Sequence, residues 1–362
     1  MKVEDSKALK EYQEKLKRAR CTGNLIDPDE SLTVRMNRIQ RAKNDVKYLV
    51  ETYLPHYATA DCADFQIAHA NKVMNDPIYK GYAEWGRGLA KSVWNDVIIP
   101  LWLWINGETH YMCIVSDTFD RACDLLEDLR AEFEANELLK HDFGEQYNPG
   151  YWEKGNFVTM NGFICKAFGA KQKVRGLRKG AHRPDLWVID DLETPQTIKN
   201  NRMQDDYADW IEADILATMT GKRRRLIGAN NRFASRMVQT LLKQRHPDWD
   251  WNLVKAYDPV TYEPAWKSMY SAQFYRQQEK DMGILAAHAE YNHVPLVKGR
   301  IFKPEMVKWG KLPDLHTMNA IVAHWDIAYA GTDTSDFNAC KIWGRHRNEF
   351  WLIDGFVKQS KM

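Results

Sequence analysis

Long hydrophobic runs are absent from this sequence. The longest apolar stretch, VIIPLWLWI at 97–105, contains a proline and has less than half of the roughly 20 residues that a membrane span needs. The N-terminal segment MKVEDSKALKEYQEKLKRAR is charged throughout and lacks the apolar stretch of a signal peptide. We therefore expect neither a membrane anchor nor secretion.

Cysteine pairs and an excess of charge of one sign are also missing. The 6 cysteines include no CxxC pair, so nothing supports a zinc site or a disulfide framework. With 51 Lys plus Arg against 49 Asp plus Glu, the net charge is +2, and any nucleic-acid surface must come from local clustering. The content of 44% hydrophobic and 28% charged residues is typical of a globular chain.

Short apolar runs that alternate with longer amphipathic ones begin at about residue 78. This pattern predicts an α/β fold with a mostly parallel sheet. We expect a helical N-terminal segment at 1–55 and a main domain at 56–300. A linker at 301–317 and a further domain at 318–362 are expected to follow. The expected strands of the main domain are 78–85, 110–117, 156–160, 163–169, 185–191, 224–230 and 251–256. The amphipathic run 124–139 is expected to be a solvated surface helix.

The segment WGRGLAKS at 85–92 follows an expected strand and opens an apolar helix, which is the context of a phosphate-binding P-loop. The pattern GxxxxGK[ST] fails at both glycines, because Trp85 and Ala90 hold those positions. Lys91 still offers a charge to the β- and γ-oxygens, and Ser92 can ligate Mg²⁺ at a helix N-terminus. The alternative is an ordinary strand-to-helix turn with a surface lysine. The expected nucleotide contacts are Gly86, Arg87, Gly88, Leu89, Ala90, Lys91 and Ser92.

The segment RPDLWVIDDLE at 183–193 places acids at the carboxyl end of a buried strand, as in a Walker B motif. We expect Asp190 to hold Mg²⁺ and Asp191 to activate the attacking water, with Glu193 as the rival for the second role. The alternative is a strand end followed by a solvated acidic turn. The following strand ends at Asn230, where it could sense the γ-phosphate or form a plain Asn-rich turn.

Room for an extra strand at 110–117, between the two motifs, suggests the additional-strand (RecA-like) class of P-loop ATPases. Two basic clusters complete the pattern, one at 166–183 and one at 222–225. They could reach the nucleotide of a neighbouring subunit or a DNA phosphate track, or could simply be solvated. No aromatic stacking platform is interleaved with them, so base recognition is not indicated.

In combination, GRGLAKS, RGLRKGAHRPDLWVIDDLE, the GAN strand tip and HWDIAYAGTDTSDFNA resemble the large terminase subunit of tailed bacteriophages, from about residue 45 to the end. The resemblance implies a motor that uses ATP and Mg²⁺ to move double-stranded DNA into a procapsid, in the cytoplasm of the infected bacterial host. It also implies a small terminase subunit and a portal protein as partners, and a homo-oligomeric ring. Ala90 departs from the pattern, and so does Asp191, where many motors carry Glu.

By the same resemblance, Arg87 and either Arg175 or Arg178 are arginine-finger candidates, and Asn230 falls in the coupling motif. Asp326 ends the first strand of an RNase H-like nuclease domain that binds Mg²⁺ or Mn²⁺.

The nuclease domain is expected to be incomplete. The acids left to join Asp326 are Asp333, Asp336 and Asp354, the first two expected on a turn and the third at the far end of its strand. Because two metals need several convergent acids, we expect no DNA cleavage.

Two other functions remain open. A helicase-like nucleic-acid translocase would need a second RecA-like domain, for which 318–362 is too short. A degenerate P-loop protein that binds DNA as a structural subunit is suggested by the missing glycines. ATP turnover would separate these possibilities.

Overall fold

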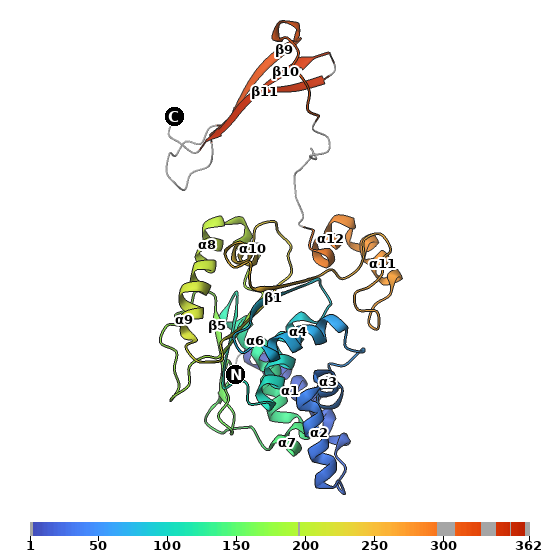
Figure 1. Cartoon of the computed structure of the whole chain (residues 1–362), viewed down its shortest axis with the longest axis vertical. Helices are drawn as coiled ribbons and strands as arrows, with labels where there is room; N and C mark the ends of the chain where they lie inside the picture. The colour runs from blue at the N-terminus through green and yellow to red at the C-terminus, as the bar shows by residue number, and fades with distance from the viewer. Residues whose placement is uncertain (1–2, 195, 295–307, 327–337, 348, 359–362) are drawn as a thin grey trace. The chain divides into compact units, whose positions relative to one another are not determined.

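The computed structural model describes residues 3–194, 196–294, 308–326, 338–347 and 349–358 (Figure 1). The contacts within the chain divide it into two compact units, Met1–Leu296 and Val297–Met362. None of the helices in the described ranges is long and apolar enough to cross a membrane.

The first unit is built on an eight-stranded sheet with the order β3-β4-β5-β2-β6-β7-β1-β8. All neighbours from β5 to β8 pair in parallel, and β3 and β4 add an antiparallel edge. The α/β class with a mostly parallel sheet is therefore confirmed. The strands are β1 (Lys80–Trp85), β2 (Tyr111–Ser116), β3 (Trp152–Glu153), β4 (Asn156–Val158), β5 (Ile164–Gly169), β6 (Leu186–Asp190), β7 (Arg225–Ala229) and β8 (Asp250–Val254).

Every strand that the sequence predicts in this unit is present, and only the two-residue β3 was missed. The strand that defines the additional-strand class is not the one expected from the sequence. Strand β2 lies outside β6, and the strand that separates β1 from β6 is β7, which comes later in the chain. The sheet thus has the additional strand, but the segment 110–117 does not supply it.

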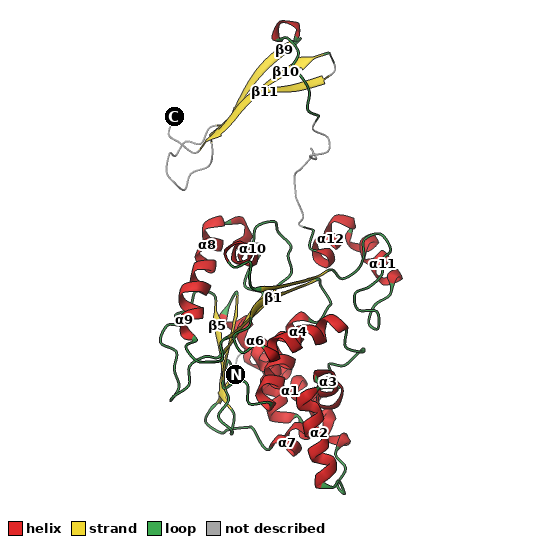
Figure 2. Ribbon diagram, in the orientation of Figure 1, coloured by secondary structure: helices red, strands yellow, loops and turns green. Residues whose placement is uncertain are grey.

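Helices cover both faces of this sheet (Figure 2). Along the buried strands, side chains alternate between two cores. Trp85, Ile114 and Val188 face the core shared with the N-terminal helices, whereas Trp187 and Ile189 face the core under α8 and α10. Both faces of these strands are apolar, as expected for a parallel sheet between helical layers. The helices are α1 (Val3–Ala19), α2 (Leu32–Asn44), α3 (Val46–Tyr53), α4 (Asp64–Asn75), α5 (Ile99–Ile105), α6 (Phe119–Ala135), α7 (Glu137–Phe143), α8 (Asn201–Trp210), α9 (Leu216–Thr218), α10 (Val238–Arg245), α11 (Ala272–Met282) and α12 (Ile284–Asn292), with π-helical turns at Val93–Ile98 and Ile211–Ile215 and 3-10 turns at Arg20–Leu25, Thr197–Lys199 and Leu315–Thr317.

The prediction of a solvated surface helix at 124–139 is wrong. Helix α6 is buried along most of its length, because α1 covers the face that the sequence shows as charged. Tyr12 of α1 donates a hydrogen bond to Glu134 at 2.5 Å, and the Arg130 guanidinium lies 4.1 Å from the centroid of the Tyr12 ring. Lys15 pairs with Asp128 at 3.0 Å. The acidic face is therefore matched by a basic helix from the distant N-terminus.

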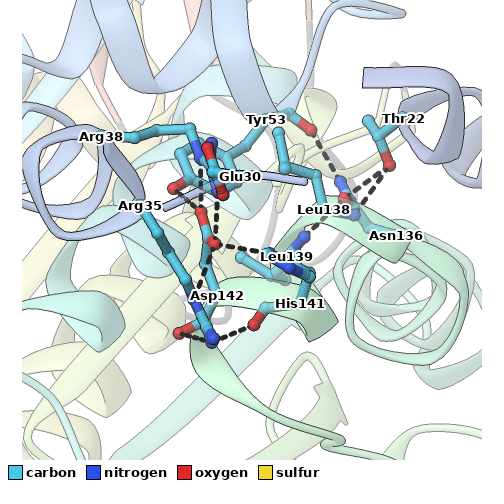
Figure 3. A network of polar contacts seen from close by, with 10 residues as sticks. All are labelled: Thr22, Glu30, Arg35, Arg38, Tyr53, Asn136, Leu138, Leu139, His141 and Asp142. Carbon is cyan, nitrogen blue, oxygen red and sulfur yellow. Dashed lines mark hydrogen bonds and ion pairs between the residues drawn. The ribbon is translucent and has the colours of Figure 1, made fainter. Parts of the chain in front are cut away.

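A buried ion-pair network ties α2 and α3 to α7 (Figure 3). Arg38 donates hydrogen bonds to both carboxylate oxygens of Asp142, at 2.7 Å each, and also pairs with Glu30. Burial alone would raise the pKa of Asp142, but hydrogen bonds from Arg38, Tyr53 and His141 outweigh it and lower that pKa. Glu30, His141 and Asp142 lie close enough together to hold a metal ion, but two guanidinium groups, Arg38 and Arg35, already balance the two carboxylates.

The described part of the second unit is an antiparallel three-stranded sheet in the order β11-β10-β9, and Asp326 ends its first strand, as expected. Their bounds are β9 (Ala320–Asp326), β10 (Asn338–His346) and β11 (Glu349–Lys358).

We expect Asp142→Ala to lower the free energy of unfolding by about 3–5 kcal/mol, because it leaves the buried Arg38 charge with Glu30 alone. Chemical denaturation of the purified chain measures this loss. The matched control is Glu51→Ala, which removes an exposed pair with Lys47 at 3.6 Å and should cost less than about 1 kcal/mol. Equal losses in the two variants would contradict the structural role of the network.

Candidate functional site

The chain leaves β1 at Trp85 and enters the loop that the sequence predicts to bind phosphates. Trp85 is fully buried and packs edge-on against Phe65 and His69, with ring centroids 4.9 and 5.3 Å apart. Gly86 follows, and a Cβ there would lie 2.2 Å from the backbone oxygen of Tyr291. The close approach that requires a glycine therefore falls at Gly86, one residue after the motif position that Trp85 occupies.

Two other residues of the loop, Gly88 and Ala90, have left-handed backbone conformations. Gly88 has a φ of 83°, and Ala90, at the second glycine position of the motif, has a φ of 60°. Residues with a Cβ pay about 1–2 kcal/mol for this conformation. The helix begins directly afterwards, with Lys91 and Ser92 in its first turn. The turn at Ala90 thus leads directly into the helix N-terminus, an arrangement that suits a bound anion.

Buried polar side chains hold the backbone of this loop. Gln66 donates a hydrogen bond to the backbone oxygen of Leu89 at 3.1 Å, and Asn95 donates one to that of Lys91 at 2.8 Å. His69 Nε2 lies 2.8 Å from Asn95 Oδ1. Burial lowers the pKa of His69 to about 4, although the hydrogen bond to Asn95 opposes this shift. The neutral imidazole therefore positions Asn95, and Asn95 positions Lys91.

Asp190, the last residue of β6, meets the start of this helix. Its carboxylate is fully buried, and the side chains of Ser92 and Asp96 contact it. Burial, followed by the charge of Asp191, raises the pKa of Asp190, while the nearby Lys91 charge and Ser92 side chain lower it. The structure therefore brings together Lys91, Ser92 and Asp190, which the sequence separates by about a hundred residues.

Sequence reasoning missed a second buried carboxylate at this place, Asp96. It lies on the π-helical turn, is 2% exposed, and its carboxylate contacts that of Asp190. Burial raises the pKa of Asp96 well above its usual range, and the charge of Asp190 adds to the increase. An acid inside the otherwise apolar run VWNDVIIPLWLW was the available signal.

The donor set around Asp190 fits a divalent cation. Mg²⁺ takes oxygen ligands, and Asp190, Asp96 and Ser92 offer carboxylate and hydroxyl oxygens at one point. Two buried carboxylates in contact with each other are costly when both are charged, and a cation would neutralise them.

Asp191 and Glu193, the two candidates for water activation, have different surroundings. Asp191 is half-buried at the sheet edge, with a φ of 46°. Glu193 is buried, and both of its oxygens are in use: Oε1 accepts from Gln204 at 3.0 Å, and Oε2 accepts from the backbone N–H of Val238 at 2.7 Å. This geometry favours Asp191 for contact with a reacting water and gives Glu193 a role in fixing the start of α10.

The end of β7 lies between those of β1 and β6. Asn230 is 5% exposed, and its backbone N–H points to the oxygen of Ala83 on β1 at 3.4 Å. The next residue, Asn231, donates to the backbone oxygen of Glu290 at 2.9 Å. The Glu290 carboxylate in turn pairs with Arg87 at 2.8 Å. One residue near the end of α12 therefore connects the loop arginine to the tip of β7.

The structure does not bring Arg175 and Arg178 to this edge of the sheet. The segment between β5 and β6 runs back to the opposite edge along the outer helices, and Arg175 pairs there with Asp214. Arg178 is exposed.

An apolar cavity opens beside the loop, with a volume of about 240 Å³. Tyr57, Trp94, Trp266 and Met269 line it together with Gly88. These residues come from segments on both sides of the loop in sequence, which is why the sequence did not reveal the cavity.

In the second unit, Asp326 and Asp354 lie on opposite faces of the sheet. Asp326 pairs with Ala339 of β10, whereas Asp354 pairs with Ile342, three residues further along. Since successive residues of a strand alternate between faces, this register separates the two acids, and a β-bulge follows directly after the pair of Asp354 with Ile342. The expectation that Asp354 lies at the far end of β11 is wrong, because it lies near the middle. Asp333 and Asp336 are outside the described residues.

The first unit is an additional-strand P-loop fold: β1 leads into the loop, β6 carries the acid, and β7 separates them. Comparisons with protein-family models and with curated proteins find no match. Among solved structures, this chain is similar to the large terminase of bacteriophage HK97, at 12% identity over 81% of this chain and 62% of that one, with a TM-score of 0.40. This chain therefore spans less than two thirds of the HK97 protein.

The large terminase of a thermophilic bacteriophage in complex with ADP is also similar, at 10% identity over 82% of this chain and 68% of that one, with a TM-score of 0.41. A chain of the bacteriophage Phi-29 viral genome packaging motor assembly is similar at 10% identity, over 81% of this chain and 80% of that one, with a TM-score of 0.33. The similar structures are thus phage large terminases and a packaging motor.

We expect Ala90→Gly to retain nucleotide binding and Ala90→Val to abolish it. Glycine relieves the left-handed strain, whereas a β-branched residue adds to it and should lower the free energy of unfolding by roughly 2 kcal/mol. Titration with a fluorescent ATP analogue and thermal unfolding measure the two effects. Tight binding by the valine variant would mean that the loop conformation does not matter.

Stability should also fall in acid because of His69. Its pKa is near 6.5 in the unfolded chain and about 4 in the folded one, so the unfolded state binds more protons between these values. The contribution of His69 to the free energy of unfolding is therefore complete above pH 6.5. It decreases as the pH falls, and about 3 kcal/mol of it is lost near pH 4. Denaturation of the wild type and of His69→Gln at pH 7 and pH 4.5 isolates it. The same pH dependence in both proteins would refute the assignment.

Proposed function

We propose that this chain is an ATP-hydrolysing motor subunit that moves double-stranded viral DNA into a procapsid. The observation that supports the ATPase part is the meeting of Lys91 and Ser92 with the buried carboxylates of Asp190 and Asp96. The DNA-packaging part rests on the order of the motifs, which resembles that of large terminase subunits. The host cytoplasm, a small terminase subunit, a portal protein and a homo-oligomeric ring belong to the same proposal.

In this proposal the loop Gly86–Ser92 binds the phosphates of ATP, and Ser92 and Asp190 hold Mg²⁺ with Asp96 beside them. Bound Mg²⁺ supplies charge neutralisation at the β- and γ-oxygens. Lys91 contributes a second positive charge, held in place through its backbone by Asn95. Asp191 orients the attacking water at the sheet edge.

The apolar cavity beside Gly88 suits the base of the nucleotide. Its aromatic walls, Trp94 and Trp266, offer a stacking surface, and Gly88 and Ala90 of the loop also line it.

The arginine candidates divide into two kinds. Arg87 is in the loop itself, where Glu290 restrains it at 2.8 Å, so it would have to exchange partners to reach a γ-phosphate. Arg175 and Arg178 would have to act on the nucleotide of a neighbouring subunit. Asn230, between the ends of β1 and β6, would sense hydrolysis.

The nuclease part of the proposal is limited. Asp326 would hold Mg²⁺ or Mn²⁺ only with acids other than Asp354, because that residue lies on the opposite face of the sheet. Of the other functions, the degenerate P-loop subunit is disfavoured by the conformation of Ala90, which keeps the loop geometry despite the missing glycine.

We expect Lys91→Ala to abolish ATP hydrolysis, because no other charge in the loop except Arg87 could stabilise the γ-phosphate. Asp190→Asn should weaken the dependence on Mg²⁺, and Asp191→Asn should slow turnover with binding retained. DNA-stimulated phosphate release measures each rate. The matched control is Lys17→Ala, at an exposed site on α1.

Two results would require a revision. Wild-type turnover by the Lys91→Ala variant would exclude the ATPase proposal. If Glu193→Gln were the only slow variant among the acids, the water-activating role would pass from Asp191 to Glu193.

A further inference from the structure

A broad groove opens at the amino edge of the sheet, the edge opposite to Lys91 and Asp190. Its volume is about 990 Å³, and it lies where β6 and β7 begin. Arg183, Lys222 and Arg223 line it, together with Glu108 and Asp185. The fold therefore joins the ends of both basic clusters of the sequence, 166–183 and 222–225, at one surface.

The acids of the groove are occupied by donors of the protein. Glu108 accepts from Arg223 at 2.7 and 2.9 Å and from the buried Arg225 at 3.1 Å. Asp185 accepts a hydrogen bond from the Thr109 hydroxyl at 2.7 Å. It also accepts from the backbone N–H groups of His110 and Tyr111. Neither carboxylate therefore repels an anion as strongly as a free one would.

Two cations of the groove remain available. Arg183 and Lys222 are exposed, and within the described ranges neither side chain has a hydrogen bond or an ion pair. The residues that line the groove include no Phe, Tyr or Trp among the described residues. The aromatic ring of the lining is His182, and it already stacks on His110 with ring centroids 5.4 Å apart. A surface with free cations and no Phe, Tyr or Trp in its lining suits a phosphate backbone rather than exposed bases.

We propose that this groove binds the phosphate backbone of double-stranded DNA, with Arg183 and Lys222 as direct contacts. The inference rests on the proposed function, and it gives the DNA a place on the chain that the ATPase motifs do not specify. Because the groove and the nucleotide site are at opposite edges of one sheet, the chain can hold DNA and nucleotide at the same time.

The test compares the wild type with the double variant Arg183→Ala/Lys222→Ala. Binding to fluorescent duplexes of about 30 base pairs and of several sequences is measured between about 0.05 and about 0.5 M salt. Each lost phosphate contact should reduce the slope of log K against log salt by about 1, and weaken binding at about 0.1 M salt roughly tenfold, for every sequence alike. ATP turnover without DNA should be unchanged.

The control with the same change of charge is Lys10→Ala/Lys17→Ala, at exposed positions of α1, which should keep the wild-type slope. A wild-type slope in the groove variant would overturn the inference while leaving the proposed function intact. A wild type that binds no DNA would instead remove the proposed function.

Two further arms identify the ligand. Inorganic phosphate or ATP at millimolar concentration should not displace the duplex, and displacement would make the groove a site for small anions. The same measurement is made with single-stranded DNA. If the wild type binds the single strand more tightly than the duplex, and the groove variant loses affinity for both equally, the assignment to double-stranded DNA is rejected.

Discussion

The parallel insertion of β7 between β1 and β6 is the constraint on which the candidate site depends. Ala229 of β7 pairs with Ala83 on one side and with Asp190 on the other. In a parallel sheet the carboxyl ends of neighbouring strands lie at one edge, so the loop after β1, the acid of β6 and Asn230 meet without further arrangement. A different strand order would leave the same motifs on unrelated parts of the sheet.

This edge concentrates features that weaken a fold when they occur singly. Asp96 and Asp190 are two acids buried in contact with each other, and Ala90 has a left-handed backbone. The surrounding contacts that hold them are ordinary, such as the hydrogen bonds of Gln66 and Asn95 to the loop backbone. Local conflicts that the rest of the fold supports are typical of functional sites, and here they coincide with the residues that suit a nucleotide and a divalent cation.

The strands and motifs could be predicted because their signals are local. A run of apolar residues followed by acids marks β6 and Asp190 whatever the rest of the chain does. The parts that were missed depend on partners far along the chain: Arg130 and Glu134 look solvated until α1 is placed over them, and Glu290 has no recognisable motif although it contacts the loop. Sequence order also misidentified the additional strand, since the position between β1 and β6 is filled by a strand that follows both of them in the chain.

The two edges of the sheet carry opposite chemistry and are connected by the same strands. Strand β6 begins next to Asp185, at the basic groove, and ends at Asp190, beside the loop. Its five residues span roughly 17 Å and are buried on both faces, so it cannot bend independently of the sheet. If nucleotide binds at the loop and DNA at the groove, as proposed, this buried strand is the direct structural connection between the two sites.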